Sequence, residues 1–255
     1  METAEKKSKI QAVSRAIDIL RCFDGRKELG ITEISKAVGL HKSTAAGLVS
    51  TLCAERMLEQ NEVNGKYRLG LELFRLGKNV NTDLHELCHP YLLDLSEAVG
   101  ETVNMAMLDG DAVVYIDKID SPRSMRIVSR IGQRIPFYCT ANGKALIARQ
   151  PKDVIDALLA DFKPQIYTEK TIKTADEMRR VLSKSLEDGY ACDDEEYETG
   201  LICYSVPIVK HEGQPDLAIS VSGPAGRMQG EFRERVLENL KATAEKISRA
   251  VRDYM

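Results

Sequence analysis

Two short polar segments contain residue types that contact nucleic acid. Lys66 and Arg68 lie two residues apart directly after the dipeptide Asn64-Gly65. The second segment consists of four consecutive polar residues, His41, Lys42, Ser43 and Thr44, which carry an imidazole, an ammonium group and two hydroxyls. Lys and Arg bind backbone phosphates, while short polar side chains hydrogen-bond to base edges. The chemistry indicates a nucleic-acid surface if the fold brings both segments to one face.

Hydrophobic periodicity predicts three helices around the second segment. Residues 10–23 carry apolar side chains at intervals of three and four, as one face of an amphipathic helix does. Thr32 is expected to cap a short second helix that ends at Gly39, and a third helix follows over HKSTAAGLVSTLCAER. Two helices joined by a short turn with a glycine are typical of a helix-turn-helix.

The alternating run 57–61 and the run 66–69 flank Asn64-Gly65, a strong hairpin signal. A hairpin directly after a helix-turn-helix is a wing, and Lys66 and Arg68 on its return strand are expected to reach phosphate, as is Lys42. The alternative is that the two wing cations only keep an exposed strand edge soluble.

Charge separates this part from the rest of the chain. Residues 1–78 hold 14 Lys or Arg and 10 Asp or Glu, a net charge of +4, whereas the other 177 residues hold 22 and 29, a net charge of −7. This distribution of charge favours contact with a polyanion through residues 1–78, because the acidic remainder of the chain is repelled by it. We therefore expect a DNA-binding domain over 1–70, a linker helix over 71–99 with a possible break before Pro90, and a second domain over 100–255.

The second domain is expected to be α+β with an antiparallel sheet. Hairpins are predicted around Asp109-Gly110 and around Glu212-Gly213. Helices are predicted over 143–149, after Pro151, over 175–188 and over 230–254.

The cysteines and the hydropathy pattern narrow the compartment. Six Cys stand singly without a CxxC pair, so neither a disulfide scaffold nor a zinc module is expected, and no metal or cofactor is assigned. No apolar run has the length of a membrane span, and no apolar segment follows the charged start as in a secretory signal. The expected location is the cytoplasm.

The ordered motifs of the chain resemble the IclR family of bacterial transcription regulators. The resemblance rests on AVSRAIDILRCF, LGITEISKAVGLHKSTAAGLVSTL and GKYRLGLELFRLG, and on GETVNMAMLDGDAVVYIDKIDSPRSMRIVSRIGQRIPFYCTANGKALIA, GYACDDEEYETGLICYSVPI and LAISVSGPAGR. It implies a winged helix-turn-helix that binds palindromic operator DNA as a homodimer or homotetramer. It also implies a GAF-like effector domain, and a repressor of catabolic genes for a small organic acid.

The third helix departs from the family pattern at Ala46 and Gly47, where bulky polar residues are usual. Ala and Gly offer no hydrogen bonds to bases, so readout is expected from His41, Lys42, Ser43 and Thr44.

The resemblance also implies an effector pocket in the second domain. Carried over by position, its wall comprises Ile127, Ile135, Ala141, Asn142, Asp193, Leu201, Cys203, Ser220 and Ser222. Asn142 and Gly143 begin a predicted helix, where backbone N–H groups favour an anion. Ser220 and Ser222 share one strand face and could donate to one carboxylate, and Asp193 could accept from a ligand hydroxyl. The expected effector is a small hydroxy or keto carboxylate.

Several alternatives stay open. Serines at i and i+2 of a strand are commonly a solvent face, the DDEEYE run is commonly a solvated loop, and Cys203 suits an inert core position. A Cys-dependent hydrolase would need Cys139 or Cys203 beside His211, and a redox-sensing regulator without a metabolite effector would need an exposed thiol of low pKa. Neither thiol has a cation next to it in sequence, and neither a GxSxG elbow nor a phosphate loop is present.

Overall fold

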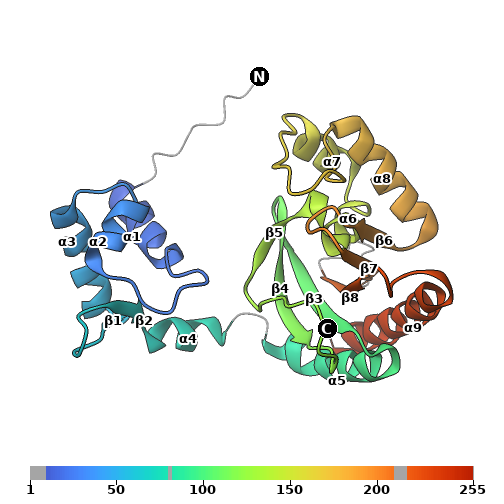
Figure 1. Cartoon of the computed structure of the whole chain (residues 1–255), viewed down its shortest axis with the longest axis horizontal. Coiled ribbons are helices and arrows are strands. Elements are labelled where there is room, and N and C mark those ends of the chain that lie inside the picture. The colour runs from blue at the N-terminus through green and yellow to red at the C-terminus, as the bar shows by residue number, and fades with distance from the viewer. Residues whose placement is uncertain (1–9, 80–81, 210–216, 255) are drawn as a thin grey trace. The chain divides into compact units, whose positions relative to one another are not determined.

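The computed structural model describes residues 10–79, 82–209 and 217–254, which belong to two compact units, Met1–Thr82 and Asp83–Met255 (Figure 1). The N-terminal unit contains helices α1 (Gln11–Arg21), α2 (Ile31–Ala37) and α3 (Lys42–Ala54), then strands β1 (Leu58–Gln60) and β2 (Tyr67–Leu69), and helix α4 (Leu71–Gly77). Its core is formed by Ile19, Phe23, Leu29, Ile34, Val49, Leu52 and Leu58. The predicted winged helix-turn-helix is confirmed.

The second helix begins two residues earlier than predicted. Gly30, not Thr32, is the N-cap of α2, and its backbone N–H donates to the Glu33 carboxylate at 2.7 Å. Glu33 at the third helical position therefore satisfies the N-cap N–H, which is the glutamate half of a capping box, while Gly30 has no side chain to accept an N–H of the first turn.

The wing is anchored at its base and along its loop. β1 and β2 pair in antiparallel fashion, and Leu29 forms an additional bridge with Tyr67. The connection is longer than a two-residue turn, because only Leu58–Gln60 and Tyr67–Leu69 are paired. Both Asn61 and Asn64 donate from their side-chain amides to the Glu28 carboxylate at 2.9 Å, so the loop is held against the segment that precedes α2.

The expected linker helix over 71–99 is wrong as a single element. The chain forms two helices there, α4 and α5 (Thr82–Val99), and Pro90 lies inside α5 instead of ending it. A proline in a helix removes one backbone hydrogen bond. Burial of Leu92, Leu95 and Val99 in the core of the C-terminal unit offsets that loss.

The C-terminal unit is built on a six-stranded antiparallel sheet of order β5-β4-β3-β8-β7-β6 (Figure 1). The strands are β3 (Thr102–Asp109), β4 (Ala112–Ile119), β5 (Arg134–Pro136), β6 (Ala191–Asp194), β7 (Leu201–Ile208) and β8 (Leu217–Pro224). A short 3-10 helix, η1 (Phe137–Cys139), precedes α6 (Ala141–Ile147), and the other helices are α7 (Lys152–Leu159), α8 (Ala175–Asp188) and α9 (Gly230–Tyr254). The predicted α+β class is confirmed.

Helices cover both faces of the sheet (Figure 1). On one face, α5 and α9 pack against apolar residues of β3, β7 and β8, among them Met105, Tyr204 and Val221. On the other face, α6, α7 and α8 pack against Ala106, Tyr115 and Ala218. Strand alternation therefore sends successive residues of the central strands to two different environments.

The predicted hairpin at Asp109-Gly110 is present, with Asp109 opposite Ala112 and Gly110 at a φ of 62°. β7 and β8 also pair as predicted, but Glu212-Gly213 lies outside the described residues. Helix α8 ends at Gly189 in the left-handed conformation, as the sequence indicated. Within the described ranges, no helix combines the length and the apolar character that crossing a bilayer would require.

Candidate functional site

The N-terminal unit presents the predicted contact residues on one helix. His41 is the N-cap of α3, and Lys42, Ser43 and Thr44 form its first turn, with all four side chains exposed. The His41 ring nitrogen Nδ1 lies 2.9 Å from the Ser43 hydroxyl oxygen. The helix keeps its opposite side, with Ala45, Val49 and Leu52, in the core. Its polar first turn is therefore free to meet another molecule.

The middle of α3 is a smooth exposed surface. Ala46 and Gly47 are exposed, and a methyl group added at Gly47 would meet no atom within 4 Å. A helix with small side chains on its outer face can approach a groove floor more closely than one with long side chains. The structure thus supports close backbone approach at these two positions.

The two wing cations differ in their surroundings. Both Lys66 and Arg68 are exposed, but Arg68 binds the Glu59 carboxylate across the hairpin, at 2.9 Å from Nη2 to Oε2. Binding to Arg68 is also the largest cause that lowers the pKa of Glu59. Arg68 must share or exchange this carboxylate to contact a phosphate, which sequence reasoning did not foresee.

In the C-terminal unit, Asn142 joins three elements through its side-chain amide. Its Nδ2 donates to the Ser220 hydroxyl at 3.0 Å, and its Oδ1 accepts from the Ser205 hydroxyl at 2.7 Å. All three side chains are buried. The predicted pair Asn142 and Ser220 is therefore brought together, and the view of Ser220 and Ser222 as a solvent face is wrong.

A second amide completes this buried polar cluster. Asn104 on β3 donates from Nδ2 to the Ser222 hydroxyl at 3.3 Å and accepts from the Ser129 hydroxyl through its Oδ1. Sequence reasoning missed Asn104, Ser129 and Ser205. The strand register could have identified Asn104 and Ser205. Asn104 on β3 and Ser205 on β7 both lie opposite Ser220 on the central strand β8.

Asp193 lies beside a buried ion pair that also escaped prediction. Lys144 is fully buried, and its Nζ lies 2.5 Å from Oε1 of Glu196. Asp193 is only 2% exposed and accepts the backbone N–H of Glu196 at 2.8 Å. Burial is the largest cause that raises the pKa of Asp193, to about 7, and the nearby Lys144 opposes that shift. Burial therefore disfavours the charged form of this carboxyl group.

The apolar wall residues fall into two groups. Ala141, Leu201 and Cys203 form a small cluster with Ile127 and Tyr197. Ile135 packs instead with the residues beneath α6 and α8. Three of the nine predicted wall residues therefore lie in the polar cluster and four in this small apolar group. Asp193 lies beside the buried ion pair, and Ile135 belongs to a different part of the core.

The start of α6 offers less to an anion than expected. The Gly143 N–H donates to the Thr140 hydroxyl at 3.1 Å, so this amide already has an acceptor. Gly143 is needed for packing, because a methyl group there would lie 2.4 Å from backbone atoms of Phe137. The chemistry for a polar ligand therefore rests on the hydroxyls and on Asp193 more than on the helix terminus.

The cysteine alternatives find no support in the site. Burial raises the pKa of the Cys139 thiol and of the Cys203 thiol, so both are held in the less reactive neutral form. His211, the proposed partner in a hydrolase, lies outside the described residues.

Comparisons with known proteins agree over nearly the whole chain. Residues 78–249 match the family described as Bacterial transcriptional regulator IclR C-terminal, and residues 12–62 match the IclR helix-turn-helix domain. The HTH-type transcriptional regulator XynR of Escherichia coli K12 is 37% identical over 245 residues, which cover 95% of this chain and 97% of XynR. The regulator KdgR of the same organism is 35% identical over 241 residues, covering 94% and 92%. The crystal structure of the Thermotoga maritima IclR has a TM-score of 0.74 at 30% identity, with 94% of this chain and 98% of that chain covered.

The raised pKa of Asp193 predicts a specific pH dependence of stability. Because the folded pKa of about 7 lies above the ordinary value of 3.8, Asp193 contributes stability below about pH 4 that is lost as the pH rises to 7. Asp193→Asn stays neutral, so its free energy of unfolding relative to wild type should rise between pH 4 and 7, by at most about 1.4 kcal/mol per pH unit. Urea unfolding at several pH values measures this.

The control is Asp161→Asn, since the Asp161 side chain is 81% exposed and pairs only at the surface with Lys163. Its stability relative to wild type should change little over the same range. A difference between Asp193→Asn and wild type that is constant from pH 4 to 7 would contradict the buried carboxyl.

Proposed function

Because the chain belongs to the IclR family of bacterial transcriptional regulators, we propose that it is a ligand-responsive repressor that binds a palindromic operator. The proposed targets are catabolic genes for a small organic acid, and the proposed location is the cytoplasm, where that DNA is. Family and relatives are regulators of transcription, not enzymes. The observation that carries the operator proposal is the exposed polar first turn of α3, followed in the same unit by a cationic wing.

Recognition by α3 is proposed to combine close approach with a few polar contacts. His41, Lys42, Ser43 and Thr44 supply hydrogen bonds at the N-terminal end of the helix, where recognition helices contact base edges. Ala46 and Gly47 allow the helix to lie deep in the major groove. Lys42, Lys66 and Arg68 are proposed to bind phosphates, which position the protein without reading sequence.

The wing predicts a salt-dependent and sequence-independent contribution to affinity. In the double variant Lys66→Gln, Arg68→Gln, binding to operator and to unrelated duplex should weaken by similar factors. The slope of log K against log salt should flatten by about 2, because each phosphate contact contributes about 0.9. Fluorescence anisotropy over a salt series measures both quantities.

A matched double variant, Lys163→Gln with Arg179→Gln, removes two exposed cations from the other unit and should leave both affinities and the slope close to wild type. If the wing variant lost affinity for the operator alone, the wing would read bases, and its assignment to phosphate would be wrong.

The effector proposal rests on the polar cluster buried beside α6. Ser220 accepts from Asn142, and Ser222 accepts from Asn104 while it also hydrogen-bonds with Cys203, so a carboxylate would take the Ser222 proton in exchange for the contact with sulfur. Two such donors on one strand face suit a carboxylate. Asp193 is proposed to accept from a ligand hydroxyl, and the apolar group around Ala141 and Leu201 suits the carbon skeleton of a small hydroxy or keto acid.

Replacing both serines should separate effector binding from DNA binding. Ser220→Ala with Ser222→Ala removes the proposed donors, so calorimetric affinity for carboxylate probes such as pyruvate and lactate should fall at least about tenfold. Effector-free operator affinity should stay close to wild type, because the cluster lies in the C-terminal unit. Loss of the two acceptors also leaves two amides unsatisfied, and the unit should be less stable by about 1–3 kcal/mol per amide.

Ser96→Ala is the control, since Ser96 is a buried serine of α5 that donates only to the Glu101 carbonyl oxygen. Ser96→Ala should bind the carboxylate probes with the affinity of wild type. Unchanged affinity in the double serine variant would exclude these hydroxyls as ligand donors, and a collapse of effector-free operator binding would show that they only support the fold.

A homo-oligomer is proposed because one helix-turn-helix contacts half of a palindromic site. Large apolar side chains of the N-terminal unit support it: Ile10, Val13 and Ile17 at α1, and Leu71 and Phe74 on α4, are exposed in the single chain. On α5, Leu84, Leu87, Leu92 and Leu95 pack within their own unit and are less available for such a contact, whereas Leu93 is 41% exposed. A second interface is proposed in the C-terminal unit.

Sedimentation should therefore show at least a dimer at micromolar concentration. Phe74→Glu places a charge on the exposed apolar side of α4 and should shift the protein toward monomer and weaken operator binding. Leu186→Glu, at an exposed leucine of α8, is the matched control and should change neither. A monomeric wild-type chain that still bound operator tightly would contradict the proposal.

The effector is proposed to act by shifting this oligomer between two arrangements that space the recognition helices differently. Coupling of this kind is typically about 1–3 kcal/mol, or about 5- to 150-fold in DNA affinity.

A further inference from the structure

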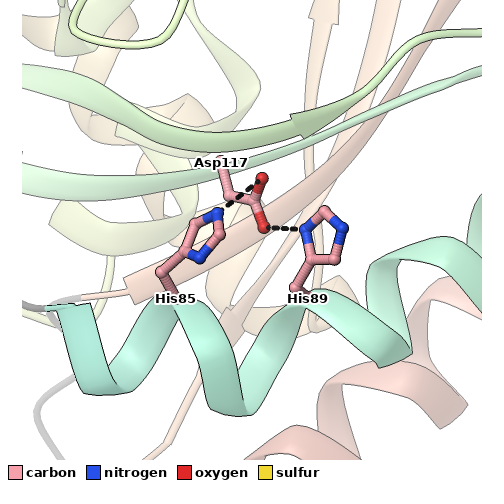
Figure 2. Close-up of side chains that lie close together, drawn as sticks. All are labelled: His85, His89 and Asp117. Atoms are coloured by element: carbon pink, nitrogen blue, oxygen red, sulfur yellow. Dashed lines mark hydrogen bonds and ion pairs between the residues drawn. The ribbon is translucent and has the colours of Figure 1, made fainter.

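We propose that His85, His89 and Asp117 form a binding site for a divalent transition-metal ion of the zinc class. The three side chains converge at one point between α5 and β4 (Figure 2). One ligand atom from each, the two ring nitrogens and a carboxylate oxygen, lie within 4.8 Å of one another. This site is distinct from the polar cluster around Asn142, because α5 covers the opposite face of the sheet.

The helix contributes two ligands because of their spacing. His85 and His89 are four residues apart, so they lie one turn apart on the same side of α5. Their rings stack with centroids 5.2 Å apart. The string His-Glu-Leu-Cys-His over 85–89 has the HExxH spacing of helical zinc ligands, and sequence reasoning passed over it.

A β-bulge turns the third ligand toward the helix. The register of β3 and β4 shifts between Met105 and Ala106, with Tyr115 opposite Ala106 and Asp117 opposite Met105, so Ile116 is the extra residue. Strict alternation would put Asp117 on the same face as Tyr115, beneath α6 and α8. The bulge reverses this, and Asp117 faces α5 instead.

The distances and burial suit a metal centre. His85 Nε2 lies 3.3 Å from Asp117 Oδ1, and His89 Nδ1 lies 2.8 Å from Asp117 Oδ2. Ligand atoms at about 2.0–2.2 Å from one ion lie about 3–4 Å from one another, so small ring rotations would suffice. The Asp117 side chain is 2% exposed, whereas the two imidazoles are about 40% exposed, at 43% and 37%, and leave a path for an ion.

The donor set selects the kind of ion. Two imidazoles and one carboxylate suit Zn²⁺ and its first-row neighbours, while Mg²⁺ and Ca²⁺ prefer oxygen ligands throughout. The Asp117 carboxylate also accepts the backbone N–H of Lys118 at 2.7 Å. Hydrogen bonds of this kind hold the ligands of metal sites in a fixed orientation. A buried carboxylate also costs free energy unless positive charge compensates it, and a divalent cation supplies that charge.

The site is proposed to bind metal without a peptidase reaction. Glu86, the residue that acts as general base in HExxH enzymes, is exposed, and the family regulates transcription. A bound ion would clamp the first turns of α5 to β4. His85 is only two residues after Asp83, where the C-terminal unit begins. The clamp would therefore fix the point at which the chain enters this unit.

The test compares zinc uptake by full-length proteins that have been reduced and stripped with a chelator. In a calorimetric titration, wild type should bind one more equivalent of Zn²⁺ than the double variant His85→Gln/His89→Gln does. If the double variant still binds this equivalent, its affinity for Zn²⁺ should be at least about tenfold weaker than that of wild type. Glutamine keeps an N–H donor for Asp117, so the hydrogen-bonded fold is retained. His41→Gln, at an exposed histidine of the other unit, is the matched control and should take up Zn²⁺ with the stoichiometry and affinity of wild type.

Two further readouts separate this site from adventitious binding to cysteine. Co²⁺ in place of Zn²⁺ should give visible ligand-field bands without a thiolate charge-transfer band, and the bands should vanish in the double variant. Zn²⁺ should also raise the Tm of wild type and of His41→Gln, but not of the single variant His89→Gln. Equal zinc stoichiometry and affinity in wild type and double variant, or no zinc uptake by wild type, would overturn the proposal and leave the cluster a hydrogen-bonded clamp.

Discussion

The side-chain amide of Asn142 is the interaction on which the interior of the C-terminal unit depends. It donates to Ser220 on β8 and accepts from Ser205 on β7, so one residue in the first turn of α6 joins two adjacent strands. Each of these groups is buried, and replacing Asn142 would remove the hydrogen bond that each serine makes with it, although Ser205 also donates to the Ile219 carbonyl oxygen. Gly143, the next residue, lets the first turn of α6 lie directly against the backbone of Phe137. The polar cluster therefore belongs to the fold as well as to the proposed effector site.

Much of the fold follows from periodicity and turn chemistry. The alternation on either side of Asp109-Gly110 predicted β3 and β4, and the glycine at 189 predicted the end of α8. These features depend on neighbours in sequence, which a reader of the sequence can see. The IclR resemblance then located a site whose members, such as Asn142 and Ser220, are distant in sequence but adjacent in space.

What could not be predicted depends on contacts between distant residues. Nothing local marks Ile116 as the extra residue of a bulge, so the side to which Asp117 points followed only from the sheet register. The pairing of Lys144 with Glu196 and of Arg68 with Glu59 likewise required the tertiary structure. The helix over 82–99 persisted through Pro90 because packing of its apolar side outweighed the local preference. The pair His85 and His89 differs from these cases, because its spacing was visible in the sequence.

The ion pair between Glu59 and Arg68 has a consequence for the search for an operator. Glu59 occupies the guanidinium group as a phosphate would, so any duplex must compete with a carboxylate that is tethered beside its binding partner. If Arg68 binds phosphate as proposed, this competition would weaken the contribution of the wing on every duplex alike, because phosphate contacts carry no sequence information. Discrimination between operator and unrelated DNA would then depend more on α3 than on the wing.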